Sequence, residues 1–320
     1  MPNSIQIMSL KNLIESDFPE PGWWVKNILP KRGTTIIGGD SGNKKTFLAL
    51  EIAIKCSTGM RFLDIFECKK AKVLYIDEEN DKSLIKSRMI KLLKGNKISE
   101  IPGLLAFAFG NQLKLNKKGK DELDKLLTTY KPNIVILDSM VRFIEGDEDK
   151  SSDVKKNTSI LKFLTDKHNC SFLALHHTTK RKAGSKHSLR GSGEFSAFVD
   201  LLIMVSGTVN LKLKQEKNRY CGATEIGGFD VIDCENGGLK VISVEIDKNT
   251  KTKFEQLKEI IPLWILQKKG SEKVLFDEIL RSMESKGFKK SLISKALKTI
   301  SEEGILAKCG HGMYEIPKSN

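Results

Sequence analysis

The segment Gly39-Asp-Ser-Gly-Asn-Lys-Lys-Thr46 has the residue types of a phosphate-binding loop. In such loops, glycines let successive backbone N–H groups converge on phosphates at the N-terminus of a helix. The pattern requires Gly, four free positions, Gly, Lys and then Ser or Thr, and Gly39, Lys45 and Thr46 match it. Lys44 stands where the second glycine is usual, so it must adopt the backbone angles of the turn, and it adds positive charge near the phosphates. The segment therefore predicts a variant nucleotide-binding loop.

Two cofactors follow from this loop, ATP and Mg²⁺. Lys45 is expected to contact the β- and γ-phosphates, and the hydroxyl of Thr46 is expected to ligate Mg²⁺. The residues expected to bind the nucleotide are Gly39, Asp40, Ser41, Gly42, Asn43, Lys44, Lys45, Thr46 and Phe47. The alternative is a glycine turn that matches by coincidence, and the strand and helix patterns on either side of the loop argue against it.

Acidic residues follow two other apolar segments. Val73-Leu-Tyr-Ile-Asp-Glu-Glu79 is the pattern of a buried strand that ends in carboxylates, one of which could polarise an attacking water. Ile134-Val-Ile-Leu-Asp138 has the shape of a Walker B strand, whose aspartate holds Mg²⁺ through water. Either pattern alone indicates only the end of a strand. The assignment of water activation and Mg²⁺ binding to these acids depends on both patterns following the predicted nucleotide-binding loop in this order.

A pair of histidines follows the next apolar segment, in Ala174-Leu-His-His-Thr-Thr-Lys180. Paired histidines suggest a metal site, but no third ligand lies nearby in the sequence, which argues against zinc. The interpretation we favour is a polar sensor of the γ-phosphate, with a solvent-facing loop as the alternative.

Short apolar segments alternate with helical patterns along the first 205 residues. Near-continuous apolar segments are typical of strands buried on both faces of a parallel sheet, and their alternation with helices predicts an α/β fold. The expected strands are 34–38, 72–77, 104–109, 134–138, 171–175 and 201–205, and the expected helices are 47–55, 82–93, 121–130 and 153–168. Residues 210–217 and 227–245 have the pattern of antiparallel hairpins that close the edge of the sheet.

The last part of the chain has a different pattern. Helices are expected at 254–268, 275–286 and 292–303, with a hairpin at 305–316, which is the order of a winged helix. Residues 251–320 hold 14 Lys and Arg against 9 Asp and Glu, a net +5, which leaves +9 for the other 250 residues. If the third helix enters the major groove of DNA, the side chains available for contact are Lys289, Lys290, Ser294, Lys295 and Lys298. A protein-interaction winged helix or a small helical cap is the alternative.

Length and composition set wider limits. The 320 residues suffice for one full-sized domain and a smaller one, predicted as 1–252, with 1–25 as a lead-in, and 253–320. The formal net charge of +14 fits a polyanionic partner such as nucleic acid, with a lysine-rich solvated surface as the alternative. Six cysteines without metal-binding spacing, no signal-peptide pattern and no membrane-length apolar stretch predict a cytoplasmic protein.

Taken together, these motifs resemble the RecA-like P-loop ATPases, and most of all the RepA-type replicative helicases of plasmids and phages. The similarity covers the chain from Pro21-Gly-Trp-Trp-Val25 to the hairpins that end near residue 245. The resemblance implies that Glu79 activates water, with Glu78 as a rival for that role. It also implies that His177 is the sensor side chain.

The resemblance further implies an arginine that reaches the active site of a neighbouring subunit. Arg190 matches the finger assigned in RepA-type rings, whereas Lys217-Asn-Arg219 resembles the Lys-x-Arg motif of DnaB-like helicases, and the sequence does not choose between them. Pairing of Arg190 and Arg219 with local acids is the alternative. If a neighbouring subunit supplies this arginine, the active site of a single subunit is incomplete. The resemblance therefore implies a homo-oligomer such as a hexamer.

The expected function is Mg²⁺-dependent ATP hydrolysis by an oligomeric DNA helicase or translocase that serves replication of a plasmid, virus or other mobile element. Single-stranded DNA is the expected partner of the ATPase oligomer, and duplex DNA that of the winged helix. Two alternatives stay open. One is an ATP-regulated DNA-binding protein with slow turnover, which Lys44 favours. The other is a RecA- or KaiC-like recombination or regulatory ATPase, against which the lack of a strand-exchange loop signature argues.

Overall fold

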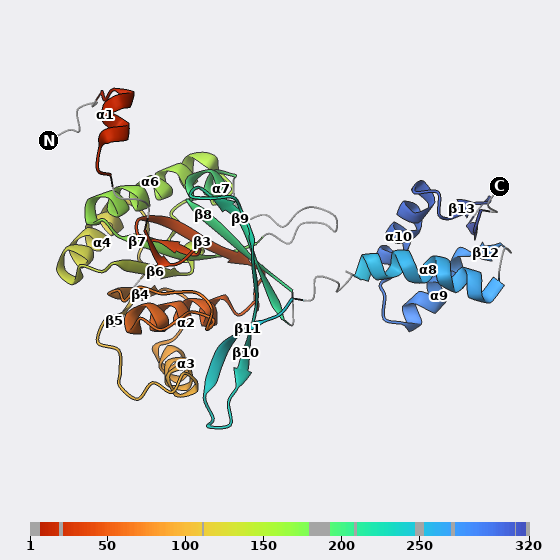
Figure 1. Cartoon of the computed structure of the whole chain (residues 1–320), viewed down its shortest axis with the longest axis horizontal. Helices are drawn as coiled ribbons and strands as arrows, with labels where there is room; N and C mark the ends of the chain where they lie inside the picture. Colours follow the sequence, from red (N-terminus) through yellow and green to blue (C-terminus); the bar gives the residue numbers. More distant parts are fainter. Residues whose placement is uncertain are drawn as a thin grey trace. The chain divides into compact units, whose positions relative to one another are not determined.

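The computed structural model describes residues 7–18, 22–110, 112–178, 193–207, 210–246, 253–269, 273–310 and 312–317. The chain divides into two compact units, Met1–Ile246 and Asp247–Asn320 (Figure 1). The first unit contains a large sheet between two layers of helices, and the second is mostly helical with a small sheet.

The apolar segments of the first unit pair into one sheet, as the sequence predicts. Over the described residues, nine strands follow the order β11-β10-β9-β8-β3-β7-β6-β4-β5. Their bounds are β3 (Gly33–Gly39), β4 (Val73–Asp77), β5 (Leu105–Phe109), β6 (Ile134–Asp138), β7 (Ser171–His177), β8 (Leu201–Ser206), β9 (Leu211–Asn218), β10 (Glu225–Asp233) and β11 (Leu239–Val244). Neighbours from β8 to β5 are parallel, and β9, β10 and β11 extend the sheet in antiparallel pairs. The mostly parallel sheet with antiparallel edge hairpins is therefore confirmed.

Helices bury both faces of the central strands. They are α2 (Lys45–Thr58), α3 (Lys82–Gly95), α4 (Lys117–Tyr130), α5 (Met140–Phe143), α6 (Ser151–His168) and α7 (Glu194–Phe198). Figure 1 shows α2 and α3 on one side of the sheet and α4 and α6 on the other. Successive side chains of a strand enter different cores, since Ile37 and Tyr75 lie in one hydrophobic cluster and Ile36 and Ile76 lie in the other. Two buried faces explain why these strands are apolar throughout.

Helix α4 begins earlier than its hydrophobic pattern predicts. It starts at Lys117 rather than at residue 121 because the side chain of Asn116 caps it and accepts a hydrogen bond from the N–H of Gly119. Its first turn, Lys117 to Lys120, is rich in lysine and contains a glycine, so the sequence of that turn resembles a surface loop.

Three short elements precede the sheet. Helix α1 (Leu10–Glu15) is capped by Ser9 and has no buried residue, and β1 (Trp23–Val25) pairs antiparallel with β2 (Leu29–Pro30). The sequence prediction treats residues 1–25 only as a lead-in, because elements of two to six residues carry too little periodicity to be recognised.

The second unit has its own core. Its elements are α8 (Lys253–Lys269), β12 (Val274–Leu275), α9 (Phe276–Ser285), α10 (Lys290–Glu302), β13 (Ala307–Lys308) and β14 (Met313–Glu315), and the strands pair antiparallel in the order β12-β14-β13. The three helices pack together through apolar side chains such as Ile261, Ile279 and Leu297. Strand β12 has no counterpart in the sequence prediction because two residues show no pattern. Over the described part of the chain, no helix combines the length and apolar character needed to cross a bilayer.

Candidate active site

The phosphate-binding loop lies at the carboxyl ends of the parallel strands. The strand register places Gly39 of β3 beside His177 of β7, and Asp77 of β4 beside Asp138 of β6. The order β3-β7-β6-β4 thus gathers the predicted motifs at one edge of the sheet. A cavity of about 260 Å³ opens there and is lined by the loop together with Glu79, Arg88, Asp138 and His177.

Neighbouring strands hold the loop from both sides. Gly42 has a φ of 87°, a left-handed conformation that glycine adopts readily. The side chain of Asn43 is buried and donates a hydrogen bond to the carbonyl of Val205 at 3.1 Å, which ties the loop to β8. On the other side, the hydroxyl of Thr178, directly after β7, donates to the carboxylate of Asp40. Hydrogen bonds to the segments on both sides therefore hold the loop.

Lys45 begins α2 and directs its ammonium back over the loop. Its Nζ donates to the carbonyl oxygens of Gly39 at 2.9 Å and Asp40 at 2.8 Å. Burial lowers the pKa of Lys45, whereas the negative charges of Asp138, Glu79 and Asp40 act in the opposite direction. A phosphate would bring negative charge to this desolvated cation, so Lys45 fits the predicted contact with the β- and γ-phosphates.

Lys44 points away from Lys45. It precedes α2 with a φ of 53°, in the left-handed region that favours glycine, and its ammonium forms an ion pair with Asp230 of β10. Burial would raise the pKa of Asp230, but hydrogen bonds from Lys44 and the backbone hold that pKa below its ordinary value. Lys44 lines the cavity, yet the second positive charge expected near the phosphates is paired within the chain.

Replacing Lys44 by glycine should leave the affinity for ATP within about threefold of the wild type. Glycine removes a left-handed backbone cost of about 1 kcal/mol, and the change also removes a partly exposed ion pair worth about 0–1 kcal/mol, so the two effects largely cancel. Titration with a fluorescent ATP analogue measures the affinity. A loss of tenfold or more would show instead that Lys44 contacts the nucleotide.

Asp138 ends β6 beneath the loop. Its side chain is buried, which raises the pKa of its carboxyl to about 6 despite a hydrogen bond from the hydroxyl of Tyr75 at 2.7 Å. The Thr46 side chain also hydrogen-bonds this carboxylate. A buried carboxylate beside the Thr46 hydroxyl fits a Mg²⁺ site that phosphate oxygens and water complete. Among the described residues, no group of three or more His, Cys, Asp and Glu is arranged to hold a metal by itself.

The two candidate glutamates face different parts of the fold. Glu79 lines the cavity. The carboxylate of Glu78 instead accepts hydrogen bonds from the backbone N–H groups of Gln112 and Leu113, both at 3.1 Å. It also occupies the space beside Gly110, where an added Cβ would lie 1.3 Å from Oε1. The structure thus places Glu79, and not Glu78, where a water could be oriented, and the catalytic role of Glu79 stays a prediction.

His177 lies beside Glu79 in the cavity, with its Nε2 3.9 Å from Oε1 of that carboxylate. The imidazole is the largest influence on Glu79 and lowers its pKa to about 2, although burial acts in the opposite direction. The Ser139 side chain and the charge of Arg142 lower it further. Glu79 is therefore ionised at neutral pH, which is the state that can orient water and accept a proton.

Replacing His177 by alanine should raise the pKa of Glu79 from about 2 toward the value of about 4.3 that is usual for glutamate. Because the folded pKa of Glu79 is lowered, its ionisation stabilises the wild type above about pH 4.3, and this contribution is lost as pH falls toward 2. The variant should lack most of that contribution. Titration of the side-chain carboxyl carbon by NMR measures the pKa, and an unchanged midpoint would exclude His177 as the cause.

Arg88 of α3 is a cavity residue that no sequence pattern marks. Its guanidinium lies over the ring of Phe47, 5.1 Å from the centroid, and donates to Oδ1 of Asn80 at 3.3 Å. In the sequence it is one of several cations on a polar helix, and only the packing of α3 against α2 brings it to the cavity. It adds a positive charge to the cavity that Lys45 also lines.

Of the two arginines predicted to reach a neighbouring subunit, the structure describes only Arg219. Arg190 lies outside the described residues. Arg219 donates to Oδ1 of Asp200 at 3.2 Å and to backbone carbonyls at the end of α7, and Lys217 donates to carbonyls of the same helix. Within one chain, both cations of the Lys-x-Arg segment are therefore bound locally, and a role of Arg219 in a neighbouring active site stays a prediction.

The arrangement of loop, Asp138 and Glu79 at the ends of buried parallel strands defines a class of protein, the P-loop ATPases. Residues 2–183, more than half of the chain, match the AAA domain family. The chain belongs to that family, whose members bind nucleotides. Among curated proteins, none matches the sequence.

Proposed function

We propose that this P-loop ATPase hydrolyses ATP with Mg²⁺ in a homo-oligomer, such as a hexamer, that binds DNA and moves along it. The role is that of a RepA-type helicase or translocase in replication of a plasmid, virus or other mobile element. The observation that carries the proposal is the placement of Lys45, Asp138 and Glu79 around one cavity, which joins phosphate binding, metal binding and water activation.

Each side chain of the cavity has a distinct task in this proposal. Lys45 binds the terminal phosphates, while Thr46 and Asp138 hold the metal side of the nucleotide. The bound Mg²⁺ supplies neutralisation of phosphate charge. Glu79 orients the attacking water, and His177 lowers the pKa of its carboxyl and senses the γ-phosphate.

The second unit supports a DNA-binding role. Its order of helix, strand, two helices and two strands, with an antiparallel sheet, is the order of a winged helix, in which the third helix enters the major groove. Helix α10 buries Ile293, Leu297 and Ile300 in the core of the unit. Its other face is exposed and carries the predicted DNA contacts Lys290, Ser294, Lys295 and Lys298, and the fifth, Lys289, is exposed directly before the helix. We therefore assign this face to DNA.

Replacing Lys290, Lys295 and Lys298 together by alanine should weaken duplex binding at least about tenfold. If each lysine contacts one phosphate, the slope of log affinity against log salt should become shallower by about 2 to 3. Binding isotherms at several salt concentrations measure both quantities. The matched control replaces three exposed lysines of the first unit, Lys86, Lys91 and Lys125. Equal losses in both variants would contradict a specific role for α10.

The experiment that tests the function is ATP turnover with and without single-stranded DNA, on protein whose assembly is followed by native mass measurement. We expect oligomers in the presence of ATP and a rate that DNA increases. Oligomers whose rate is unaffected by single-stranded DNA over a range of salt concentrations would contradict translocation.

One observation favours a second function, an ATP-regulated DNA-binding protein with slow turnover. Arg219 and Lys217 are both bound within their own chain, and without an arginine from a neighbour, P-loop sites hydrolyse slowly. A Glu79→Gln variant separates the two functions. A nucleotide-controlled switch would keep its DNA affinity and its function in replication, whereas a motor would stall.

A further inference from the structure

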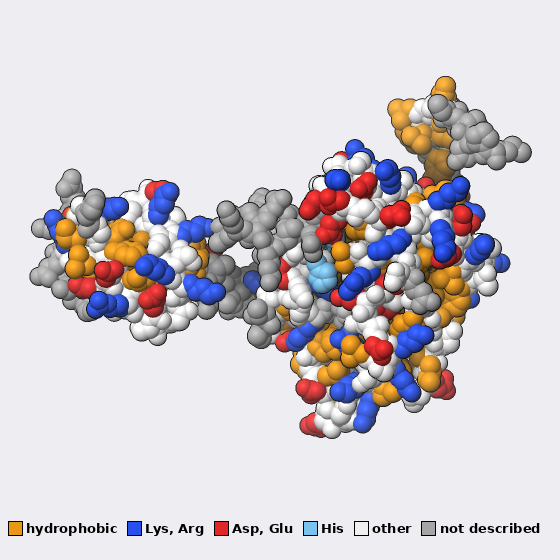
Figure 2. Space-filling view, turned by 180° about the vertical axis from the view of Figure 1, so that it is seen from behind, with side chains coloured by type: hydrophobic (Ala, Val, Ile, Leu, Met, Phe, Trp, Pro, Cys, Tyr) orange, Lys and Arg blue, Asp and Glu red, His pale blue; other side chains and the backbone are white. Residues whose placement is uncertain are grey.

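Lysine side chains gather at the amino edge of the large sheet, opposite to the edge that holds the nucleotide cavity. The segments that enter β3, β4 and β6 at this edge all carry cations, as does the turn between β1 and β2. Figure 2 shows lysine and arginine side chains on the right flank of the first unit, below α1. We call the following lysines, five of them exposed and one half-buried, the amino-edge patch: Lys26, Lys31, Lys69, Lys70, Lys72 and Lys131.

Backbone hydrogen bonds join these segments into one surface. The N–H of Lys69 donates to the carbonyl of Trp24 at 2.8 Å, and the N–H of Lys26 donates to the carbonyl of Glu67 at 3.1 Å. The segment that enters β6 donates in turn to the backbone directly before β4. The patch therefore continues from the hairpin of β1 and β2 across the starts of β4 and β6.

The charge of the patch is not neutralised within the described part of the chain. None of its six lysines forms an ion pair with another described residue. Two acids at the same edge, Asp166 and Asp200, pair instead with Arg32 and Arg219. The segments 26–32, 67–72 and 131–133 together hold seven cations and one acid, Glu67. The surface is therefore strongly positive and suited to a polyanion.

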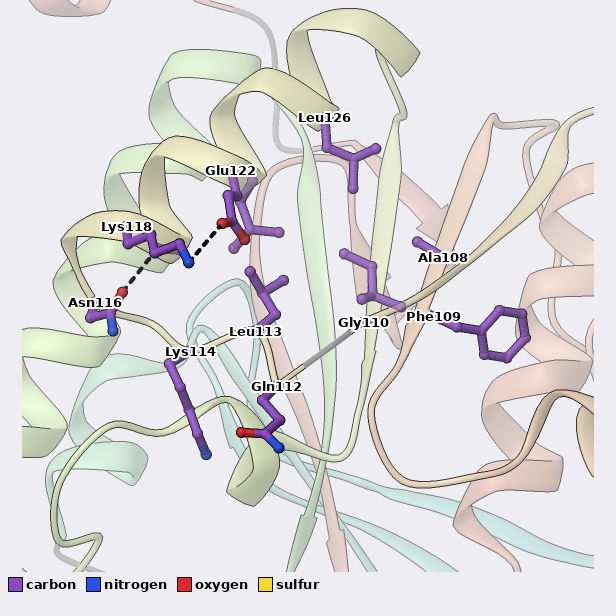
Figure 3. A pocket seen from close by; sticks show the side chains of 13 residues that line it. Ala108, Phe109, Gly110, Gln112, Leu113, Lys114, Asn116, Lys118, Glu122 and Leu126 are labelled. Atoms are coloured by element: carbon purple, nitrogen blue, oxygen red, sulfur yellow. Dashed lines mark hydrogen bonds and ion pairs between the residues drawn. The ribbon is translucent and has the colours of Figure 1, made fainter.

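The lysines that line a second hollow of the first unit are already bound within the chain. A groove of about 680 Å³ between α4 and β5 is lined by Lys114 and Lys118, and Figure 3 shows the ammonium of Lys118 directed at the carboxylate of Glu122. That ion pair measures 3.8 Å, and Lys114 donates to the carbonyl of Arg142 at 2.6 Å. A polyanion would have to displace these partners, whereas it meets no such competition at the amino-edge patch.

Aromatic rings orient two lysines of the patch. The Nζ of Lys31 lies over the ring of Trp24, 5.2 Å from its centroid, and the Nζ of Lys72 lies over the ring of Tyr130 at 4.1 Å. Cations that are already ordered lose less conformational freedom when they bind phosphate. Because lysines occupy these ring faces, bases cannot stack on them. The surface therefore fits the phosphate backbone better than unpaired bases.

The extent of the patch matches a duplex. Strands β3 and β4 are three places apart in the sheet, which is about 14 Å at a strand spacing of about 4.8 Å. Duplex DNA carries one phosphate for about every 1.7 Å of its axis, so several phosphates fit along this edge. One strand alone has about half of that charge density.

We propose that the amino-edge patch binds the phosphate backbone of duplex DNA, independently of α10 in the second unit. The inference rests on the proposed DNA-binding function and adds a DNA contact to the ATPase unit itself. Phosphate contacts position DNA without reading its sequence, so this contact has no sequence preference. Because the patch and the cavity lie at opposite edges of the sheet, a duplex on the patch leaves the nucleotide site open.

Replacing Lys26, Lys69 and Lys70 together by alanine tests the proposal in the full chain. If each of these exposed lysines contacts one phosphate, duplex affinity should fall at least about tenfold, and the slope of log affinity against log salt should become shallower by about 2 to 3. The same loss is expected when the starting protein already carries the three alanines in α10, because the two surfaces act independently. Binding isotherms with a duplex of mixed sequence, at several salt concentrations, measure both quantities.

The matched control replaces Lys86, Lys91 and Lys125, which removes the same charge from other exposed positions of the first unit. Both variants should keep nucleotide affinity within about twofold, because none of these lysines lines the cavity. Equal losses of duplex affinity in the two variants would overturn the patch as a specific surface. A greater loss for single-stranded DNA than for the duplex would overturn the choice of duplex.

Acetylation of lysines in the wild type gives a test that needs no variant. With saturating duplex, we expect the acetylation rates of Lys26, Lys69 and Lys70, followed by peptide mass spectrometry, to fall at least about threefold, and those of Lys86 and Lys91 to change less. Protection of α10 without protection of the patch would overturn the inference and leave the proposed DNA-binding function standing. A wild type that binds no DNA would overturn both.

Discussion

Replacing Glu79 by glutamine should lower the rate of ATP hydrolysis about 10²- to 10³-fold while ATP binding is retained. Glutamine keeps the shape of the side chain but cannot accept a proton, and general-base groups contribute about 10²- to 10⁴-fold to catalysis. Lys45 and the loop, which we expect to bind the phosphates, are untouched by this change. Phosphate release and equilibrium nucleotide binding, measured on the same preparation, separate the two effects.

The matched control for Glu79→Gln is Glu78→Gln in the adjacent residue. Because Glu78 binds the N–H groups of Gln112 and Leu113 and does not line the cavity, its variant should lose less than about tenfold in rate. It should instead lose about 1–2 kcal/mol of stability, since a charge-assisted pair of hydrogen bonds is weakened. A larger rate loss in Glu78→Gln than in Glu79→Gln would reverse the assignment.

Replacing Lys55 by methionine should destabilise the first unit by about 3–5 kcal/mol. Glu51 and Lys55 of α2 are 0% and 1% exposed, with Nζ 3.5 Å from Oε1, and Asn96 at the end of α3 hydrogen-bonds both. Without the ammonium, the Glu51 carboxylate is buried and uncompensated. Urea unfolding of the variant and the wild type measures the difference in free energy.

Two controls identify the buried charge as the cause of that loss. Burial already raises the pKa of Glu51, so the unpaired carboxyl should bind a proton as pH falls, and the variant should recover part of its stability as pH falls toward the ordinary glutamate pKa of about 4.3. The double variant Glu51→Gln with Lys55→Met has no buried charge and should recover at least about half of the loss. A loss that is independent of pH and equal in the double variant would indicate packing rather than charge.

The sheet and most of the nucleotide loop could be predicted because their physical causes are local. Ile134 to Leu137 are apolar throughout because both faces of β6 are buried, and the acid after them lies at the open edge. Glycines and a helix pattern around Lys45 indicate the turn that phosphates require. Asp138 and His177 lie at the same edge because β6 and β7 are neighbours in the parallel sheet. The alternation of strands and helices in the sequence implies this strand order but does not fix it.

The remaining features depend on packing between distant segments. Lys44 pairs with Asp230, 186 residues later, and nothing in either local sequence indicates that contact. Glu78 and Glu79 are equivalent in sequence, and only the position of the loop after β5 separates their roles. Arg88 reaches the cavity because α3 packs beside α2, and Arg219 is bound locally by Asp200, which lies directly before β8.

The central claim is that the cavity around Lys45 binds and hydrolyses ATP. The measurement that tests it most directly is steady-state phosphate release at saturating ATP and Mg²⁺, compared between the wild type and Lys45→Ala purified in parallel. We predict turnover by the wild type that is lost by more than about 10²-fold in the variant, whose fold is intact by circular dichroism. Equal rates in the two proteins would contradict the assignment of this cavity as the active site.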